Sequence, residues 1–121
     1  MTPVKPSAQA SLSRRISLFG NPTKTGILTA LALLNESYPR ELARLLNVSL
    51  SAVQVGVDSL ERQGVIATRR VGTERRVALD RRYPGSRELK DLLFKLLDAQ
   101  PSLVESIRAT RRRPRRRRKP L

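Results

Sequence analysis

The sequence has no cysteine and no histidine, and these two absences exclude several kinds of site. Without them there is no disulfide, no thiolate or imidazole metal ligand, no thiol nucleophile and no serine–histidine pair. The remaining acids are spaced in a way that we interpret as solvated faces rather than a catalytic pair. They are Glu36, Glu41, Asp58, Glu61, Glu74, Asp80, Glu88, Asp91, Asp98 and Glu105. We therefore expect no metal, no cofactor and no enzymatic activity.

Long hydrophobic segments are also missing. The longest apolar run, from Ile27 to Leu34, is interrupted by Thr29 and is far shorter than the ~20 residues that a membrane-spanning helix needs. The first residues show no secretory hydrophobic stretch. We expect a soluble, cytoplasmic protein, and the length of 121 residues favours one domain.

Acidic residues are few, with 10 against 25 Lys and Arg, and the formal net charge is +15. A sequence pI of about 11.7 is typical of a protein that binds polyanions. Eight of the cations form a terminal run, and without them the chain keeps a net charge of +7. We interpret this run as contacts to nucleic acid, although it also resembles a nuclear-localisation or acidic-lipid patch. The run consists of Arg111, Arg112, Arg113, Arg115, Arg116, Arg117, Arg118 and Lys119.

Three helices are predicted in the first half of the chain. Asn21 and Pro22 suit the start of a helix over 22–35, which is apolar most of the way round, so we expect its own core and a second subunit to bury it. A second helix begins near Pro39. Asn47 and the two residues after it form a turn, and a third helix over about 50–63 ends at Gly64. Its buried side is predicted to be Val53, Val57 and Leu60.

A hairpin and two more helices are predicted after Gly64. Strands 65–71 and 75–80 are joined through Gly72 and Thr73, and the base of the hairpin is expected to pack through Ile66, Val77 and Leu79. Ser86 is expected to cap a fourth helix, and Pro101 to begin a short fifth one. Four arginines flank the tip of the hairpin, namely Arg69, Arg70, Arg75 and Arg76. The apolar stripe of the fourth helix is Leu89, Leu92, Leu93, Leu96 and Leu97.

This order of elements resembles a winged helix-turn-helix regulator of the ArsR-like and MarR-like kind. The resemblance is carried by "LFGNPTKTGILTAL", "RELARLLNVSLSAVQ", "SLERQGVI" and "ATRRVGTERRVALD". The fold expected is mainly α with a small β-hairpin and extra C-terminal helices. Its segments are a flexible arm (1–17), the winged domain (18–84), a dimerising helical segment (85–109) and a disordered Arg-rich tail (110–121).

The resemblance implies that the helix over 50–63 enters the major groove of double-stranded DNA and that the hairpin, or wing, contacts the backbone or minor groove. Related proteins often carry Arg, Lys or other long polar groups near positions 55, 56 and 58, where this chain has Val, Gly and Asp. The implied contacts are Ser49, Ser51, Ala52, Gln54, Val55 and Asp58, with the four wing arginines. We interpret the cations as the source of affinity and the nearly neutral helix as the source of site preference.

The sequence therefore favours a homodimeric, DNA-binding transcriptional regulator that is associated with the nucleoid. In the resembling families, terminal helices pair across a two-fold axis and place two reading helices ~34 Å apart. Two alternatives remain open, a winged helix that docks a protein partner through Val55 and a nonspecific nucleoid or RNA-binding protein. A small-molecule effector also remains open, although no residue points to one.

Overall fold

A computed structural model of the chain describes residues 19–112. The predicted arm 1–17 and the cations from Arg113 to Lys119 lie outside the described residues. The elements are α2 (Pro22–Leu34), β1 (Glu36–Ser37), α3 (Pro39–Leu46), α4 (Leu50–Arg62), β2 (Ile66–Val71), β3 (Glu74–Leu79), α5 (Ser86–Asp98) and α6 (Pro101–Arg112). A helix-turn-helix followed by a hairpin and two further helices is the predicted winged-helix fold, and that prediction is confirmed.

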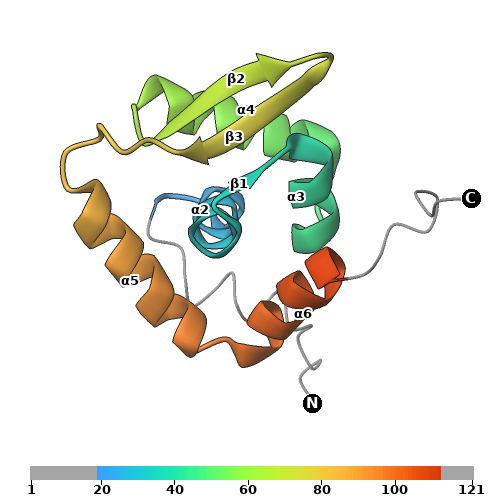
Figure 1. Cartoon of the computed structure of the whole chain (residues 1–121), viewed down its shortest axis with the longest axis vertical. Helices are drawn as coiled ribbons and strands as arrows, with labels where there is room; N and C mark the ends of the chain where they lie inside the picture. The colour runs from blue at the N-terminus through green and yellow to red at the C-terminus, as the bar shows by residue number, and fades with distance from the viewer. Residues whose placement is uncertain (1–18, 113–121) are drawn as a thin grey trace, which may run out of the picture.

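Helix α2 runs through the centre of the molecule (Figure 1), where it packs against α3, α4, α5, β1 and β3. Ile27, Leu28 and Leu31 are fully buried, whereas Leu33 and Leu34 at the end of the helix are partly buried. Gly26 allows a close approach of α3, because an added Cβ would lie 2.9 Å from Leu46 Cδ2. The other helices of the same chain therefore cover most of α2, as expected for its own core, and burial of the rest by a second subunit stays a prediction.

Local sequence signals place the ends of the central helices. The Asn21 side chain accepts a hydrogen bond from the backbone N–H of Lys24 at the start of α2, and Ser49 Oγ accepts one from Ala52 at the start of α4. Asn47 ends α3 in the left-handed conformation, with φ 56° and ψ 48°. These caps confirm the predicted turn between α3 and α4, which sets the direction of α4.

The sheet has one strand that the sequence did not predict. Glu36 and Ser37 form β1, which pairs antiparallel with β3, so that the sheet order is β1-β3-β2. The base of the hairpin packs on the helices through Ile66 and Val77, as predicted, and both side chains are buried. Strand β1 thus joins the end of α2 to the wing.

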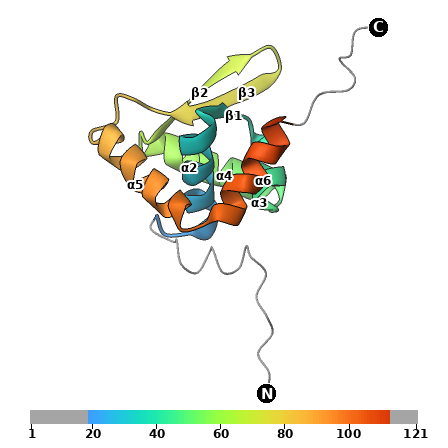
Figure 2. The same ribbon diagram turned by 60° about the horizontal axis from the view of Figure 1, so that its bottom comes forward.

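Helices α5 and α6 cover the side of α2 that faces away from the hairpin (Figure 2). The predicted cap of α5 is wrong, because Gly85 at φ 78° occupies the cap position and Ser86 is the first helical residue. Leu92 departs from the predicted stripe, since it is exposed. Helix α6 continues to Arg112, so residues 110–112 are helical and do not belong to a disordered tail. Among the described residues, no helix is long and apolar enough to cross a bilayer.

Candidate nucleic-acid interface

Helix α4 has one buried side and one exposed side. Val53, Val57 and Leu60 are buried, as predicted. The exposed positions recur at helical spacing, and their side chains form a single stripe. This stripe has a small net charge of −1, because it carries two acids and one arginine. It consists of Ser51, Gln54, Val55, Asp58, Glu61 and Arg62.

Gly56 explains part of the difference between this helix and those of related proteins. The residue is buried, and a Cβ at this position would lie 2.9 Å from Ile27 Cδ1 of α2. Position 56 therefore faces the core, where a long polar side chain has no room. Val55, by contrast, is 68% exposed, the most exposed large hydrophobic residue in the described part of the chain. Ala52 is half-buried, so it is less accessible than the four other implied contacts in α4.

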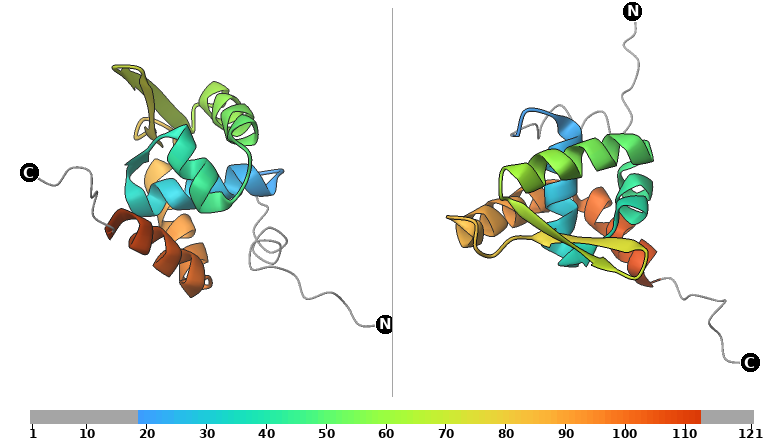
Figure 3. Two further views of the ribbon diagram at one scale, coloured as in Figure 1. Left: turned by 90° about the vertical axis from the view of Figure 1, so that its right-hand side faces the viewer. Right: turned by 90° about the horizontal axis from the view of Figure 1, so that it is seen from above.

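The hairpin and α4 lie side by side at one end of the molecule (Figure 3), and α4 contacts β2 directly. Side chains on a strand alternate between its two faces. Thr68 and Arg70 therefore share the face of Ile66, which packs into the core, whereas Arg69 lies on the other face. Thr68 Oγ1 donates a 2.7 Å hydrogen bond to Glu61 of α4. The position of the wing relative to the helix is thereby fixed.

The register of the hairpin places the wing arginines directly opposite one another, Arg69 against Arg76 and Arg70 against Arg75. Like charges directly opposite on a sheet repel one another and destabilise the pairing. An anion beside each pair relieves this repulsion. Negative groups close to the wing therefore stabilise it, and these can be protein carboxylates or nucleic-acid phosphates.

Carboxylates of the same chain supply part of this negative charge. Arg75 Nη2 lies 2.8 Å from Asp58 Oδ1 and 3.1 Å from Glu61 Oε1, both in α4. Arg69 and Arg76 each have one partner as well, at 3.0 Å from Glu36 and 3.3 Å from Glu74. Among the described residues, Arg70 has no carboxylate within ion-pair distance. These acids are paired with cations, so their interpretation as simply solvated residues is incomplete.

Arg76 has an aromatic neighbour in addition to its carboxylate. Its guanidinium carbon lies 5.7 Å from the ring centroid of Tyr38, within the range of a cation–π contact. Because Tyr38 precedes α3, this contact ties the outer face of the wing to the first helix of the motif. Of the four wing arginines, Arg70 is the one that is left most available to an external anion.

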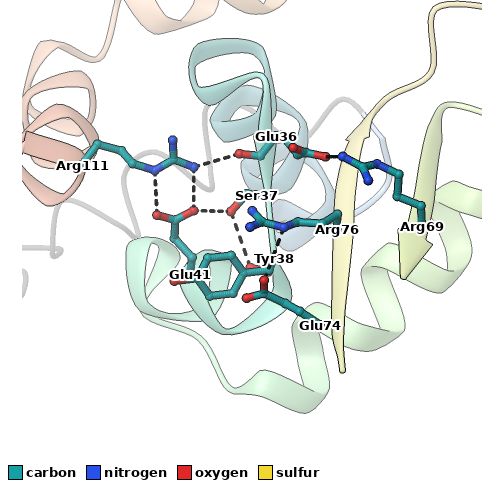
Figure 4. A network of polar contacts seen from close by, with 8 residues as sticks. All are labelled: Glu36, Ser37, Tyr38, Glu41, Arg69, Glu74, Arg76 and Arg111. Carbon is teal, nitrogen blue, oxygen red and sulfur yellow. Dashed lines mark hydrogen bonds and ion pairs between the residues drawn. The ribbon is translucent and has the colours of Figure 1, made fainter. Parts of the chain in front are cut away.

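Glu41 differs most from its predicted role on a solvated face. The residue is buried, and its carboxylate accepts hydrogen bonds from Ser37 Oγ at 2.6 Å and from the Arg111 guanidinium at 2.9 Å on both oxygens (Figure 4). Burial alone raises the pKa of Glu41, but the hydrogen bonds from Arg111 and Ser37, with the charges of Arg111 and Arg44, outweigh it and hold the pKa below its usual value. Arg111 is thus part of the folded domain.

Three exposed arginines near the motif were not among the predicted contacts. Arg62 lies in the last turn of α4, on the same stripe as Gln54 and Asp58. Arg40 and Arg44 are exposed on α3, four residues apart and therefore on one side of that helix. Their spacing on the polar sides of two predicted helices was a signal that could have identified them.

The part of the chain between 19 and 112 offers no group of acids that could hold a metal ion. One open hollow of about 550 Å³ lies between α2, β3 and α5, and its lining mixes polar and apolar residues. Residues from both sides of its rim carry opposite charges, such as Asp80 and Arg87. The hollow has no buried polar side chain without a partner, because none exists among the described residues.

Comparisons with known proteins agree with this geometry. The MarR family model matches residues 21–77, from the cap of α2 into β3. The crystal structure of the AntR antimony-specific transcriptional repressor is similar, with a TM-score of 0.56 and 18% identity over 84% of this chain and 99% of that one. The YusO protein from Bacillus subtilis is similar with a TM-score of 0.54 and 18% identity, over 87% of this chain and 82% of that one. No curated protein sequence matches the chain.

At this level of identity the two structures show a shared fold. The family match covers the helix-turn-helix and most of the wing, which are the elements described above as one surface. MarR-family proteins are transcriptional regulators that bind DNA and usually act as dimers. Of the two families that the sequence resembles, MarR is the one whose model matches. Residues 21–77 therefore match the MarR family model, and the described part of the chain has the winged helix-turn-helix fold.

Proposed function

We propose that this protein is a double-stranded DNA-binding transcriptional regulator in which α4 enters the major groove and the wing lies on the backbone or in the minor groove. The observation that carries the proposal is the joint surface of α4 and the hairpin. It combines an exposed helical stripe with a wing of four paired arginines, of which Arg70 has no carboxylate partner among the described residues. A phosphate beside Arg70 supplies the missing negative charge.

Affinity and site preference have different sources in this proposal. Each phosphate that a cation neutralises changes the slope of log affinity against log salt by ~0.9, whatever the base sequence. Base edges are read by side chains in the groove, at ~1–3 kcal/mol for a good bidentate pair. Gln54 is the side chain of the stripe best suited to an adenine edge, and Val55 can contact a thymine methyl group. Ser51 and the Ser49 cap lie at the N-terminal end of α4, where phosphates are favoured.

The regulator acts as a homodimer in this proposal, in the cytoplasm. Leu92 and Phe94 support it, because both are large, apolar and exposed on α5, away from the wing. Because they are two positions apart, they lie on different sides of the helix, and each is a candidate for part of a subunit contact. Pairing through α5 gives a two-fold axis, which places two copies of α4 in successive major grooves ~34 Å apart.

Selection from random duplexes at physiological salt tests this function. We expect the wild-type protein to enrich a two-fold symmetric motif, and the Gln54→Ala and Ser51→Ala variants to change that motif while competition by random DNA stays the same. A matched control is Gln100→Ala, which removes the same side chain outside the winged domain. If no motif is enriched, the protein binds nucleic acid without choosing a site or serves another purpose.

A second function is favoured by one observation. The 68% exposure of Val55, between half-buried Ala52 and buried Gly56, gives α4 a small apolar spot that a protein partner could contact. In that case Val55→Lys abolishes capture of the partner. The purified wild-type protein then shows no duplex binding. Duplex binding therefore separates the two functions.

A further inference from the structure

The planar guanidinium of Arg111 donates its hydrogen bonds to groups of the same chain. Its Nε and Nη2 atoms each donate a 2.9 Å hydrogen bond to Glu41, and Nη2 also donates a 2.8 Å bond to the backbone oxygen of Glu36. Bidentate pairs of this kind are among the stronger hydrogen bonds in proteins and fix both partners in orientation. Arg111 is the first cation of the terminal run, and the pair lies between the last turn of α6 and the first turn of α3.

This arrangement changes the role that the sequence suggested for Arg111. Its charge is already compensated by a carboxylate whose side chain is 5% exposed. A nucleic-acid phosphate that took over Arg111 would leave the Glu41 charge buried with Ser37 as its remaining close donor. A direct phosphate contact by Arg111 is therefore unfavourable, although the residue belongs to the most basic segment of the chain.

The same contacts determine where the basic segment begins. Strand β1 connects the two basic elements, since the backbone oxygen of Glu36 accepts from Arg111 and its carboxylate accepts from Arg69 of the wing. Figures 2 and 4 show α6 ending beside β1 and the wing on the other side of that strand. Buried Ile107, one turn earlier, holds the same side of α6 against the core. The cations from Arg113 onward follow this fixed end directly along the chain.

We propose that the Glu41–Arg111 pair is a clamp that holds the end of α6 beside β1 and delivers the cations of residues 113–119 to the same duplex that α4 and the wing contact. Arg111 is then a positioning residue for DNA binding. The proposal rests on the function proposed above. Its physical basis is effective concentration, because a second binding segment tethered at a fixed, nearby point contributes far more than one attached to a freely moving helix.

Conservative variants separate this role from a direct contact. Arg111→Lys keeps the positive charge but loses the planar fork, so it weakens the clamp without removing a cation. Glu41→Gln removes the acid and keeps a hydrogen-bond acceptor for Ser37. If Arg111 contacts DNA directly, Glu41→Gln releases it and tightens binding. If the clamp positions the basic segment, the same variant weakens binding.

The experiment measures duplex affinity and its salt dependence for the full chain in two backgrounds. One is the natural sequence, and the other has Gln at the six cationic positions from Arg113 to Lys119. In the natural background, we expect Glu41→Gln and Arg111→Lys each to weaken binding several-fold. In the neutral-tail background, both are expected to change affinity by less than about twofold. Arg108→Lys is the matched control, because Arg108 is exposed on α6 and has no ion pair in the described part of the chain.

The outcomes are distinct. Equal losses in both backgrounds show that the pair acts through the winged domain alone and overturn the proposal, as does tighter binding by Glu41→Gln. Circular dichroism and thermal unfolding identify a variant that has lost its fold. If Glu41→Gln has done so, the affinity of Arg111→Lys in the two backgrounds tests the proposal. If the unaltered protein binds no duplex at all, the proposed function itself fails. If the unaltered protein binds and the clamp variants bind equally well, only the clamp fails.

Discussion

Arg75 of the wing is held 2.8 Å from Asp58 of the helix that we expect to read DNA. This ion pair joins the two parts of the proposed interface, together with the contacts of Glu61 to Arg75 and Thr68. The pair is partly exposed, so its contribution to stability is small, about 0.2–1 kcal/mol for pairs of this kind. Its main effect is geometric, because it orients the wing and leaves Arg70 as the arginine of the tip without a carboxylate.

We expect the wing arginines to contribute unequally to DNA affinity. Arg70→Ala should lower the slope of log affinity against log salt by about 0.9, the value of one lost phosphate contact. Arg75→Ala should change the slope less, because Arg75 is already neutralised by two carboxylates. Titrations between 50 and 200 mM salt measure both slopes. Equal slopes for the two variants contradict the inequality.

Asp58 should oppose DNA binding, since its carboxylate lies on the exposed stripe of α4. Asp58→Asn removes that charge and leaves Arg75 with Glu61 as its one carboxylate partner, so we expect tighter binding to every duplex and a steeper salt slope, by up to about 0.9. Glu88→Gln on α5 makes the same change in net charge away from the interface and serves as the control. A weaker affinity of Asp58→Asn would show that the carboxylate itself reads a base, such as the amino group of cytosine.

Stability should fall in acid because of Glu41. Its pKa is lowered in the folded protein, so the stabilisation by Arg111 and Ser37 is present above the ordinary value of 4.5 and is lost as the pH falls through the lower folded value. Thermal unfolding of the wild type and of Glu41→Gln, measured from pH 7 to pH 3, tests this. The difference between the two proteins should be largest near neutral pH and should shrink below pH 4.5. A constant difference would exclude the ion pair as its cause.

The two sides of α4 should respond differently to the same truncation. Val57 is fully buried, and Val57→Ala should lower the free energy of unfolding by about 1–3 kcal/mol, from lost burial and the cavity that remains. Val55→Ala should change it by less than about 0.5 kcal/mol, as at other exposed positions. Urea unfolding measures both. A large loss at Val55 would mean that the exposed side of α4 is covered in the native assembly.

The dimer should depend on the exposed apolar residues of α5. Replacing Leu92 and Phe94 together with Lys should convert the mass measured by light scattering at micromolar concentration from that of a dimer to that of a monomer. Far-ultraviolet circular dichroism should stay unchanged, since both side chains are exposed in one chain. A monomeric wild type, or a dimeric double variant, contradicts pairing through these residues.

The sequence predicted most of the fold because its signals were local. Asn21, Ser49 and Asn47 act on neighbouring backbone groups, and the spacing of Val53, Val57 and Leu60 depends on helix geometry alone. These features need no knowledge of the tertiary structure. The helices, their turn and the hairpin could therefore be placed to within a few residues.

The sequence could not predict the contacts that join distant segments. Two residues of β1 carry too little pattern to indicate a strand, which forms because β3 is available beside it. Glu41 and Arg111 are 70 positions apart, so neither composition nor spacing links them. Burial of α2 by α5 likewise depends on the path of the chain, so the apolar pattern alone does not divide its surface between the core of one chain and a second subunit.

Protection of a cysteine at position 55 tests the central claim most directly, because the natural chain has none and Val55→Cys therefore places a single thiol on the exposed stripe of α4. The rate of alkylation is measured with and without saturating duplex DNA, with Glu88→Cys on α5 as the control. We predict that DNA slows alkylation at position 55 at least about tenfold and leaves position 88 unchanged. Equal rates at position 55 with and without bound duplex would contradict the placement of α4 against DNA.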